Sequence, residues 1–213
     1  MSVSEAAERI GVTDRHVRIL AAQGSIRLLA RGVVDSDSVA AYLRERGEVT
    51  TKVWSEATAW AAIGVLAGLD TGLVSDTRVR QLRRRIAPMT SSEFASRVRN
   101  RARIERFIGH RLVVGRVADR LVRGDLTIAD LSVERGTDGY TDRATASELD
   151  DRFRLREDTT GEIVLRVTDH LAVVERIAEH RGELLTAVDL ATSIDARERS
   201  AAHTVLDASL EGT

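Results

Sequence analysis

Two short polar segments near the N-terminus have the residue types of a metal-dependent transferase. Nine residues separate Gly24-Ser25 from Asp35-Ser36-Asp37. A Gly-Ser loop can hold a phosphate through its backbone amides, and two aspartates on one strand can bind Mg²⁺. The pattern would support metal-assisted phosphoryl transfer, with the two aspartates as metal ligands.

The residues between these segments argue against that chemistry. The stretch RLLARGVV has the pattern of two short strands around a tight turn, whereas the transferase arrangement places a helix there. Ser36 is polar at a position where a buried strand needs an apolar side chain. A turn, a hairpin and a helix cap explain the same residues, so we expect no catalytic residue in this stretch.

No other group of residues has the spacing of a catalytic or metal site. The five histidines are scattered, and the absence of cysteine excludes disulfides, thiolate zinc sites and cysteine nucleophiles. Glu148, Asp150 and Asp151 fit a solvated helix face better than a metal cluster. Phosphate-binding glycine loops and serine nucleophile motifs are missing from the sequence. We therefore expect a protein without enzymatic activity, metal or cofactor.

The segment from Val3 to Leu43 predicts the order helix, turn, helix, hairpin, helix. A first helix with one apolar face ends at Gly11, and Thr13 suits the N-cap of a second helix. The outer side of the second helix is basic, which is the layout of a recognition helix that reaches base edges in the major groove. We expect DNA contacts from this helix and from the hairpin, made by Thr13, Arg15, His16, Arg18, Arg27 and Arg31.

This order of elements resembles the winged helix-turn-helix of the MerR superfamily, and most closely its excisionase-type variant. The residues that carry the resemblance are Ser4-Glu5-Ala6-Ala7, Ile10-Gly11-Val12, His16-Val17-Arg18, Gly24, Arg31-Gly32 and Val39-Ala40-Ala41-Tyr42-Leu43. They cover about a fifth of the chain. The resemblance implies binding to double-stranded DNA, with the hairpin as a wing.

Charge is distributed unevenly along the chain. Residues 1–123 hold 22 basic and 13 acidic side chains, whereas residues 124–213 hold 10 and 20. The middle of the chain is rich in arginine, which can neutralise phosphates without reading sequence or can bind an acidic protein surface. The same arginines could also form a solvated surface or pair between helices with the acidic C-terminal half, and all four interpretations stay open. The candidates for such contacts are Arg78, Arg80, Arg83, Arg84, Arg85, Arg97 and Arg101.

The fold class predicted from these patterns is mainly α with small β elements, that is, α+β. We expect a winged helix-turn-helix domain at 1–47, a basic helical region at 53–123, and an acidic α+β domain at 124–213 that binds a partner or dimerises.

Periodicity predicts the elements of the last two regions in more detail. The basic region should hold a buried helix at 53–67 with Trp54 and Trp60 in the core, a basic helix from Ser75 to Ile86, and a helix at 92–106 that follows a capping box at Thr90. The acidic region should hold strand-like segments at 126–128 and 131–133, a short helix at 145–151, a hairpin between 153–156 and 163–167, and helices at 171–180, 184–193 and 195–210.

Three further segments carry a second, looser resemblance. They are Trp60-Ala61-Ala62 through Ala67-Gly68, Val79 to Arg85, and Ala187 to Ser193 followed by Asp195 to Arg199. These resemble actinobacterial regulators encoded beside nucleotidyltransferase-like toxins, the AbiEi type of antitoxin in type IV toxin–antitoxin systems. The resemblance implies a repressor of its own operon whose C-terminal domain neutralises the toxin.

We therefore expect a sequence-specific DNA-binding repressor that is the antitoxin of such a pair. The alternative is a stand-alone MerR/excisionase-like regulator with a C-terminal dimerisation or ligand-sensing domain. The longest apolar run, Ala57 to Gly68, is too short to span a bilayer, and no signal peptide precedes the first helix, so we expect a cytoplasmic protein that does not enter membranes. The sequence leaves open whether a monomer or a homodimer binds the operator.

Overall fold

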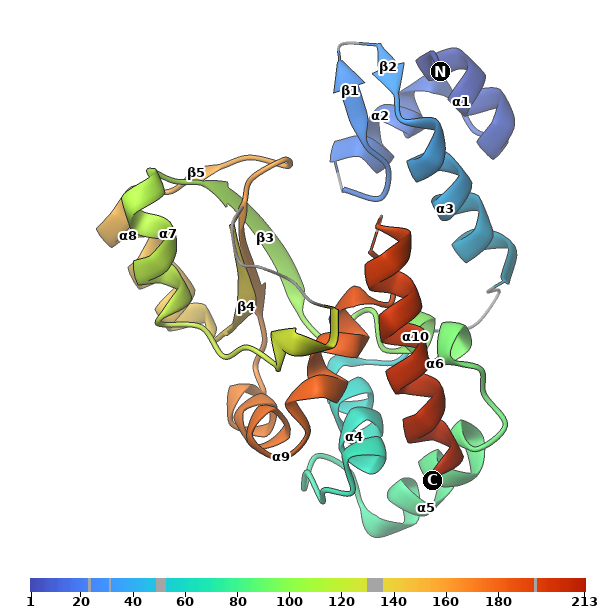
Figure 1. Ribbon diagram of the computed structural model, residues 1–213, viewed down its shortest axis with the longest axis vertical. Coiled ribbons are helices and arrows are strands. Elements are labelled where there is room, and N and C mark those ends of the chain that lie inside the picture. Colours follow the sequence, from blue (N-terminus) through green and yellow to red (C-terminus); the bar gives the residue numbers. More distant parts are fainter. Residues whose placement is uncertain (23, 31, 49–52, 130–135, 194) are drawn as a thin grey trace. The chain divides into compact units, whose positions relative to one another are not determined.

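The chain folds as two compact units, unit 1 (Met1–Thr50) and unit 2 (Thr51–Thr213). The computed structural model in Figure 1 describes residues 1–22, 24–30, 32–48, 53–129, 136–193 and 195–213. Most of these residues are helical, and two small sheets complete the fold, so the predicted α+β class is confirmed. In these ranges no helix combines the length and the apolar character needed to cross a membrane.

Unit 1 has the predicted order of elements. Helix α1 (Val3–Ile10) and helix α2 (Asp14–Ala22) are followed by strands β1 (Leu28–Ala30) and β2 (Val33–Val34) and by helix α3 (Ser36–Glu48). The two strands pair antiparallel. Local chemistry explains these boundaries, because a capping box at Ser2 begins α1 and the residue after α1 is a glycine with a left-handed φ of 75°.

The core of unit 1 is small and aliphatic. It joins the apolar sides of the three helices to the inner side of the hairpin, and its buried members are Val3, Ala6, Ala7, Ile10, Val17, Leu20, Ala21, Ile26, Val34 and Val39. The spacing of these residues is helical within each helix, which is why periodicity predicted the elements correctly.

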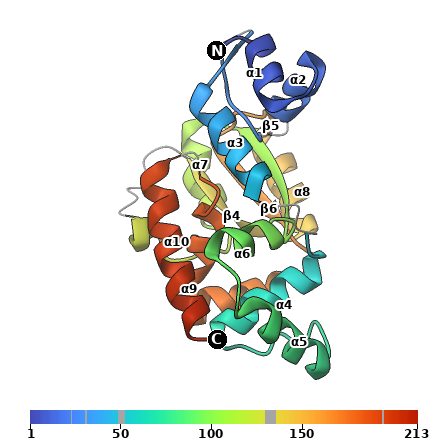
Figure 2. The same cartoon turned by 90° about the vertical axis from the view of Figure 1, so that its right-hand side faces the viewer.

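The helices of unit 2 surround a helix that is buried on all sides. Helix α4 (Glu56–Ala67) contacts α5 (Asp76–Ile86) and α9 (Leu171–Leu190), and it lies beside α9 in both views (Figures 1 and 2). Trp60 on α4 is completely buried and Trp54 is 7% exposed, so the prediction that both are core residues is confirmed. Helices α6 (Ser91–Arg97) and α10 (Ala196–Glu211) pack against each other in the same unit.

A four-stranded mixed sheet forms the other part of unit 2. Its strands are β3 (Arg103–Ile108), β4 (Thr137–Thr141), β5 (Arg156–Glu157) and β6 (Ile163–Val167), in the order β4-β6-β3-β5. Strand β6 runs parallel to β4 and antiparallel to β3. Helices α7 (Arg111–Ala118) and α8 (Arg143–Phe153) cover one face of the sheet with a separate apolar cluster.

Two boundaries predicted from the sequence are wrong. Residues 53–123 and 124–213 belong to one unit, because β3 pairs along its length with β6 and α4 packs on α9. The helix predicted at 92–106 ends at Arg97, and the second half of that range is strand β3. The capping box at Thr90 is confirmed, but nothing local in 98–106 shows that a partner strand arrives from residues 163–167.

The predicted hairpin between 153–156 and 163–167 is also wrong. Both segments contain strands, but β3 lies between them in the sheet. Residues 126–128 belong to a short 3-10 helix, η1 (Leu126–Ala129), and not to a strand, while 131–133 lie outside the described residues. The helix at 145–151 is confirmed within α8. The last three helices are confirmed in position. The first two are the halves of α9, which is interrupted at Arg181, where φ is −143° and ψ is 59°, and the third is α10.

Candidate nucleic-acid interface

Helix α2 has a buried side and a basic outer side. Val17 is completely buried and packs in the core of unit 1 together with Leu20 and Ala21. The side chains of the opposite face are exposed, and they include three of the predicted contacts, Arg15, His16 and Arg18. The burial of one face therefore holds the three side chains in solvent on the first half of the helix.

Thr13 begins α2 rather than standing free beside it. Its hydroxyl accepts a hydrogen bond from the backbone N–H of His16 at 3.3 Å, and its carbonyl accepts one from Val17 at 3.0 Å. These are the bonds of an N-cap residue. Thr13 is exposed at the end of the helix, where any group approaching the N-terminus of α2 would meet it.

The hairpin places Arg27 close to its base. The Arg27 backbone N–H donates to Ser38 Oγ, and its carbonyl accepts from the Asp35 N–H, both at 2.9 Å, so α3 fixes the backbone at this point. The Arg27 side chain is exposed. Arg31, the contact predicted at the tip of the hairpin, lies outside the described residues.

The Gly-Ser and Asp-Ser-Asp segments serve as a turn and a helix cap. Gly24 has a left-handed φ of 72°, and the Ser25 N–H closes the end of α2 by donating to the Leu20 carbonyl at 2.9 Å. The Asp35 carboxylate accepts from the Asp37 backbone N–H at 3.1 Å, as an N-cap of α3 does. In the described part of the chain, no group of three or more His, Asp or Glu side chains could hold a metal ion.

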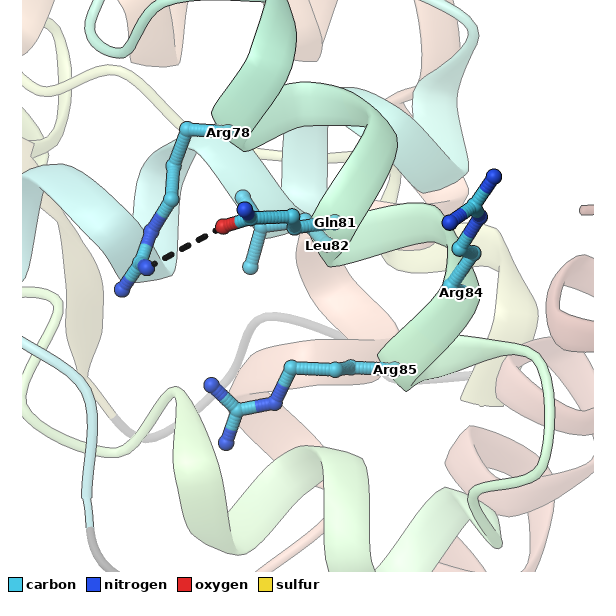
Figure 3. Close-up of a pocket in the computed structure, with 5 residues that line it drawn as sticks. All are labelled: Arg78, Gln81, Leu82, Arg84 and Arg85. Carbon is cyan, nitrogen blue, oxygen red and sulfur yellow. Dashed lines mark hydrogen bonds between the residues drawn. The ribbon is translucent and has the colours of Figure 1, made fainter.

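Helix α5 carries more closely spaced exposed arginines than the other helices of unit 2. Ser75 caps it by accepting from the Arg78 N–H, and Leu82 and Ile86 bury its inner side. A shallow hollow of about 280 Å³ lies along the helix (Figure 3), and Gln81, Leu82 and three arginines line it. In Figure 3, Arg78 and Arg85 extend in the same direction, while Arg84 points away from them. All five predicted contacts on this helix are exposed: Arg78, Arg80, Arg83, Arg84 and Arg85.

Two guanidinium groups lie near the indole of Trp54. The Arg85 guanidinium carbon is 5.8 Å from the ring centroid and that of Arg97 is 5.5 Å away, and both distances fit cation–π contacts. Burial lowers the pKa of Arg97, and the positive charge of Arg85 lowers it further. Arg97 is half-buried, whereas the sequence predicted an outward side chain that contacts phosphate or a partner.

Arg101 is not a surface contact, and its prediction as one is wrong. Its side chain is 6% exposed, and its Nε donates to the Tyr140 hydroxyl at 2.7 Å. Its guanidinium also forms an ion pair with Asp189 on α9. Burial disfavours its charge, but Tyr140 and Asp189 outweigh that cost and raise the pKa of Arg101 above its usual value. A phosphate cannot replace these partners without opening unit 2.

Asp189 joins a second buried arginine to this cluster. Arg166 on β6 lies 3.5 Å from the Asp189 carboxylate and donates to both oxygens of Asp138, at 2.6 and 2.8 Å. Burial opposes the Arg166 charge, yet the two carboxylates raise its pKa well above the usual value. The sequence contains one signal for this cluster: Arg166 interrupts an otherwise apolar strand, Ile-Val-Leu-Arg-Val.

No protein-family model, no curated protein and no solved structure matches the chain.

Proposed function

We propose that this protein is a sequence-specific transcriptional repressor that binds double-stranded DNA through unit 1. The observation that carries the proposal is the outer face of α2, where Arg15, His16 and Arg18 are exposed while Val17 anchors the helix in the core. A helix of this kind fits the major groove of B-DNA, and arginine is the side chain that most often reads guanine there.

The hairpin supports the same proposal. It follows α2 directly, as the wing of a winged helix-turn-helix does, and it exposes Arg27 beside Leu28 and Leu29. The Asp35 carboxylate caps α3 by accepting from the backbone N–H of Asp37, and the proposal assigns no catalytic residue to unit 1. Base contacts would come from α2, and phosphate or minor-groove contacts from the hairpin.

The test is footprinting of the full chain on the promoter DNA of its own gene at physiological salt. The Arg15→Ala/Arg18→Ala variant should bind the promoter about 30-fold more weakly or worse, because each lost base contact costs about 1–3 kcal/mol. The matched control is Arg9→Ala, which removes one exposed arginine from α1 and should leave the footprint unchanged. A double variant that still protects the promoter would contradict the role of α2.

The division of the chain into two compact units allows unit 2 a role other than DNA binding. Because unit 2 is a separate compact unit, it can bind a partner without using the residues of α2. The resemblance of its sequence to AbiEi-type antitoxins suggests that the partner is a nucleotidyltransferase-like toxin. We propose this partner for unit 2; dimerisation or ligand sensing by the same unit is the alternative.

Co-expression separates these two roles. The wild-type chain should restore the growth of cells that express a nucleotidyltransferase-like toxin encoded beside it, and the Arg15→Ala/Arg18→Ala variant should restore growth equally well. If the wild-type chain gives no protection although the toxin is active, the antitoxin proposal fails. The DNA-binding proposal would be unaffected by that result.

A further inference from the structure

The positive charge of α5 has no acidic partner in the part of the chain that the structure describes. Among the described residues, no carboxylate forms an ion pair with any of its five arginines. The hydrogen bonds they make are to neutral groups: Arg78 donates to Gln81, and Arg80 donates to the Asp76 carbonyl and the Thr77 hydroxyl, all at 3.4 Å. The single acid of the helix, Asp76, lies in its first turn.

This arrangement is unfavourable for the isolated protein. Arg80 and Arg84 are four positions apart on one helix, where like charges repel each other. Arg85 and Arg97 also lie close to each other, with guanidinium carbons 5.8 and 5.5 Å from the Trp54 ring centroid, and after burial the Arg85 charge is the second cause that lowers the pKa of Arg97. Repulsion of this kind would be relieved by a bound anion, so a polyanion is the ligand that the charges of α5 fit.

Among the described residues, no large apolar side chain is exposed on α5, where a protein partner would use one. Protein interfaces are usually anchored by buried aromatic or aliphatic side chains at their centre. In the described part of the chain, the exposed large apolar side chains are Ile19, Leu28, Leu29, Val33, Ile104 and Leu112, and none of these is on α5 or α6. Leu82 lines the hollow but is only 1% exposed. Arginines without apolar anchors fit a phosphate backbone better than an acidic protein surface.

We propose that α5 is a second nucleic-acid contact, which binds the phosphate groups of a DNA backbone without reading its sequence. Arg78 and Arg85 extend to the same side of the helix in Figure 3, and Arg84 lines the hollow with its guanidinium turned away from them, so a backbone that passes along α5 would meet all three on different sides of the helix. A guanidinium group matches the geometry of a phosphate. The inference goes beyond the function proposed for unit 1, because it concerns another unit and no base contact.

The experiment measures how binding of the full chain to a short duplex of arbitrary sequence depends on salt. Each phosphate contact contributes about 0.9 to the slope of log K against log salt concentration. The Arg78→Gln/Arg84→Gln/Arg85→Gln variant should therefore lose about 2 to 3 of that slope. The Lys variants at the same three positions keep the charge and should keep most of the slope, which separates loss of charge from loss of folding.

The matched control removes three exposed arginines from the other side of unit 2. Arg111→Gln/Arg116→Gln/Arg143→Gln changes the net charge equally on α7 and α8, and it should leave the slope as in the wild type. An equal decrease in this control would overturn the proposal, because the effect would then come from net charge. An unchanged slope in the α5 variant would overturn it as well.

Two further measurements identify the ligand and the unit. If the α5 variant keeps its DNA slope but loses binding to poly-glutamate, the surface binds acidic protein and the proposal is wrong. The α5 substitutions are also made in the Arg15→Ala/Arg18→Ala background, where they should lower the slope again. That result would hold even if α2 read no operator, so the two proposals can fail separately.

Discussion

Arg101 donates from Nε to the Tyr140 hydroxyl at 2.7 Å, although 39 positions separate the two residues in the chain. Arg101 comes from the segment before β3 and Tyr140 from β4, and both also contact Asp189 on α9. The contact therefore joins the basic middle of the chain to its acidic end within unit 2. The arginines of the chain therefore fall into two classes. Those of α5 are exposed, whereas Arg101 is buried and links three elements of unit 2.

Removing the shared carboxylate should destabilise unit 2 strongly. Asp189→Asn keeps the size of the side chain but leaves Arg101 and Arg166 with one counter-charge fewer in a buried setting. We expect the free energy of unfolding to fall by about 3–5 kcal/mol in urea denaturation followed by tryptophan fluorescence. Asp207→Asn, an exposed site on α10, should change it by less than about 0.5 kcal/mol. Equal effects of the two substitutions would show that the cluster does not stabilise the unit.

Tyr140 should stay protonated at a pH where an exposed tyrosine ionises. Burial raises the pKa of its phenol well above the usual value, and the Asp189 carboxylate adds to the effect. Because the folded pKa is raised, this contribution to stability is complete below the unfolded pKa of about 10 and is lost as the pH rises above it.

Absorbance of tyrosinate tests this directly, since Tyr42 and Tyr140 are the two tyrosines of the chain. The wild type and Tyr140→Phe should give the same titration up to about pH 10, because the raised pKa keeps the Tyr140 phenol protonated there. If Tyr140→Phe instead gives about half of the tyrosinate absorbance of the wild type in this pH range, the Tyr140 phenol ionises there and is accessible to solvent.

The two units should respond separately to core substitutions. Leu20→Ala removes a buried side chain of unit 1 and should destabilise that unit by about 2–5 kcal/mol. Both tryptophans are in unit 2, so circular dichroism should show earlier unfolding while the fluorescence transition stays in place. Leu184→Ala, in the core of unit 2, should move the fluorescence transition instead. If both probes shift together in both variants, the units unfold as one.

Substitutions at the cap of α3 test whether Asp35 and Asp37 have a catalytic role. Asp35→Ala removes the carboxylate that accepts from the Asp37 N–H and should lower the stability of unit 1 by about 0.5–2 kcal/mol. Asp35→Asn should cost much less, because asparagine caps helices equally well. A magnesium-dependent transfer activity of the wild type that both Asp35→Asn and Asp37→Ala abolish would restore the catalytic interpretation.

The sequence predicted those elements whose signals are local. Unit 1 is correct in order because Gly11 and Thr13 mark the ends of two helices and the apolar residues repeat at helical spacing. The outward direction of Arg15 and Arg18 follows from the same spacing, and so does the burial of Trp60 on a helix that is apolar all round. For these residues the pattern and the fold depend on neighbours within a few positions.

Strand pairing could not be predicted in the same way. Residues 103–108 form a strand because β6 arrives 60 positions later, and β5 is separated from β6 because β3 pairs between them. The local sequence pattern indicates neither of these pairings, because β-propensity depends on the partner strand. The single boundary between the units at Thr50, in place of the two predicted, has the same cause.

By itself, the sequence determined the order of the elements of unit 1, the burial of helix α4 and which side of α2 is basic, although α4 begins at Glu56 and not at the predicted residue 53. Only the tertiary structure decided that Arg101 and Arg166 are interior while the arginines of α5 are exposed. The physical reason is that a buried arginine requires a carboxylate to compensate its lost hydration. Asp189 provides that charge for Arg101 from 88 positions away, a distance over which composition and periodicity carry no information.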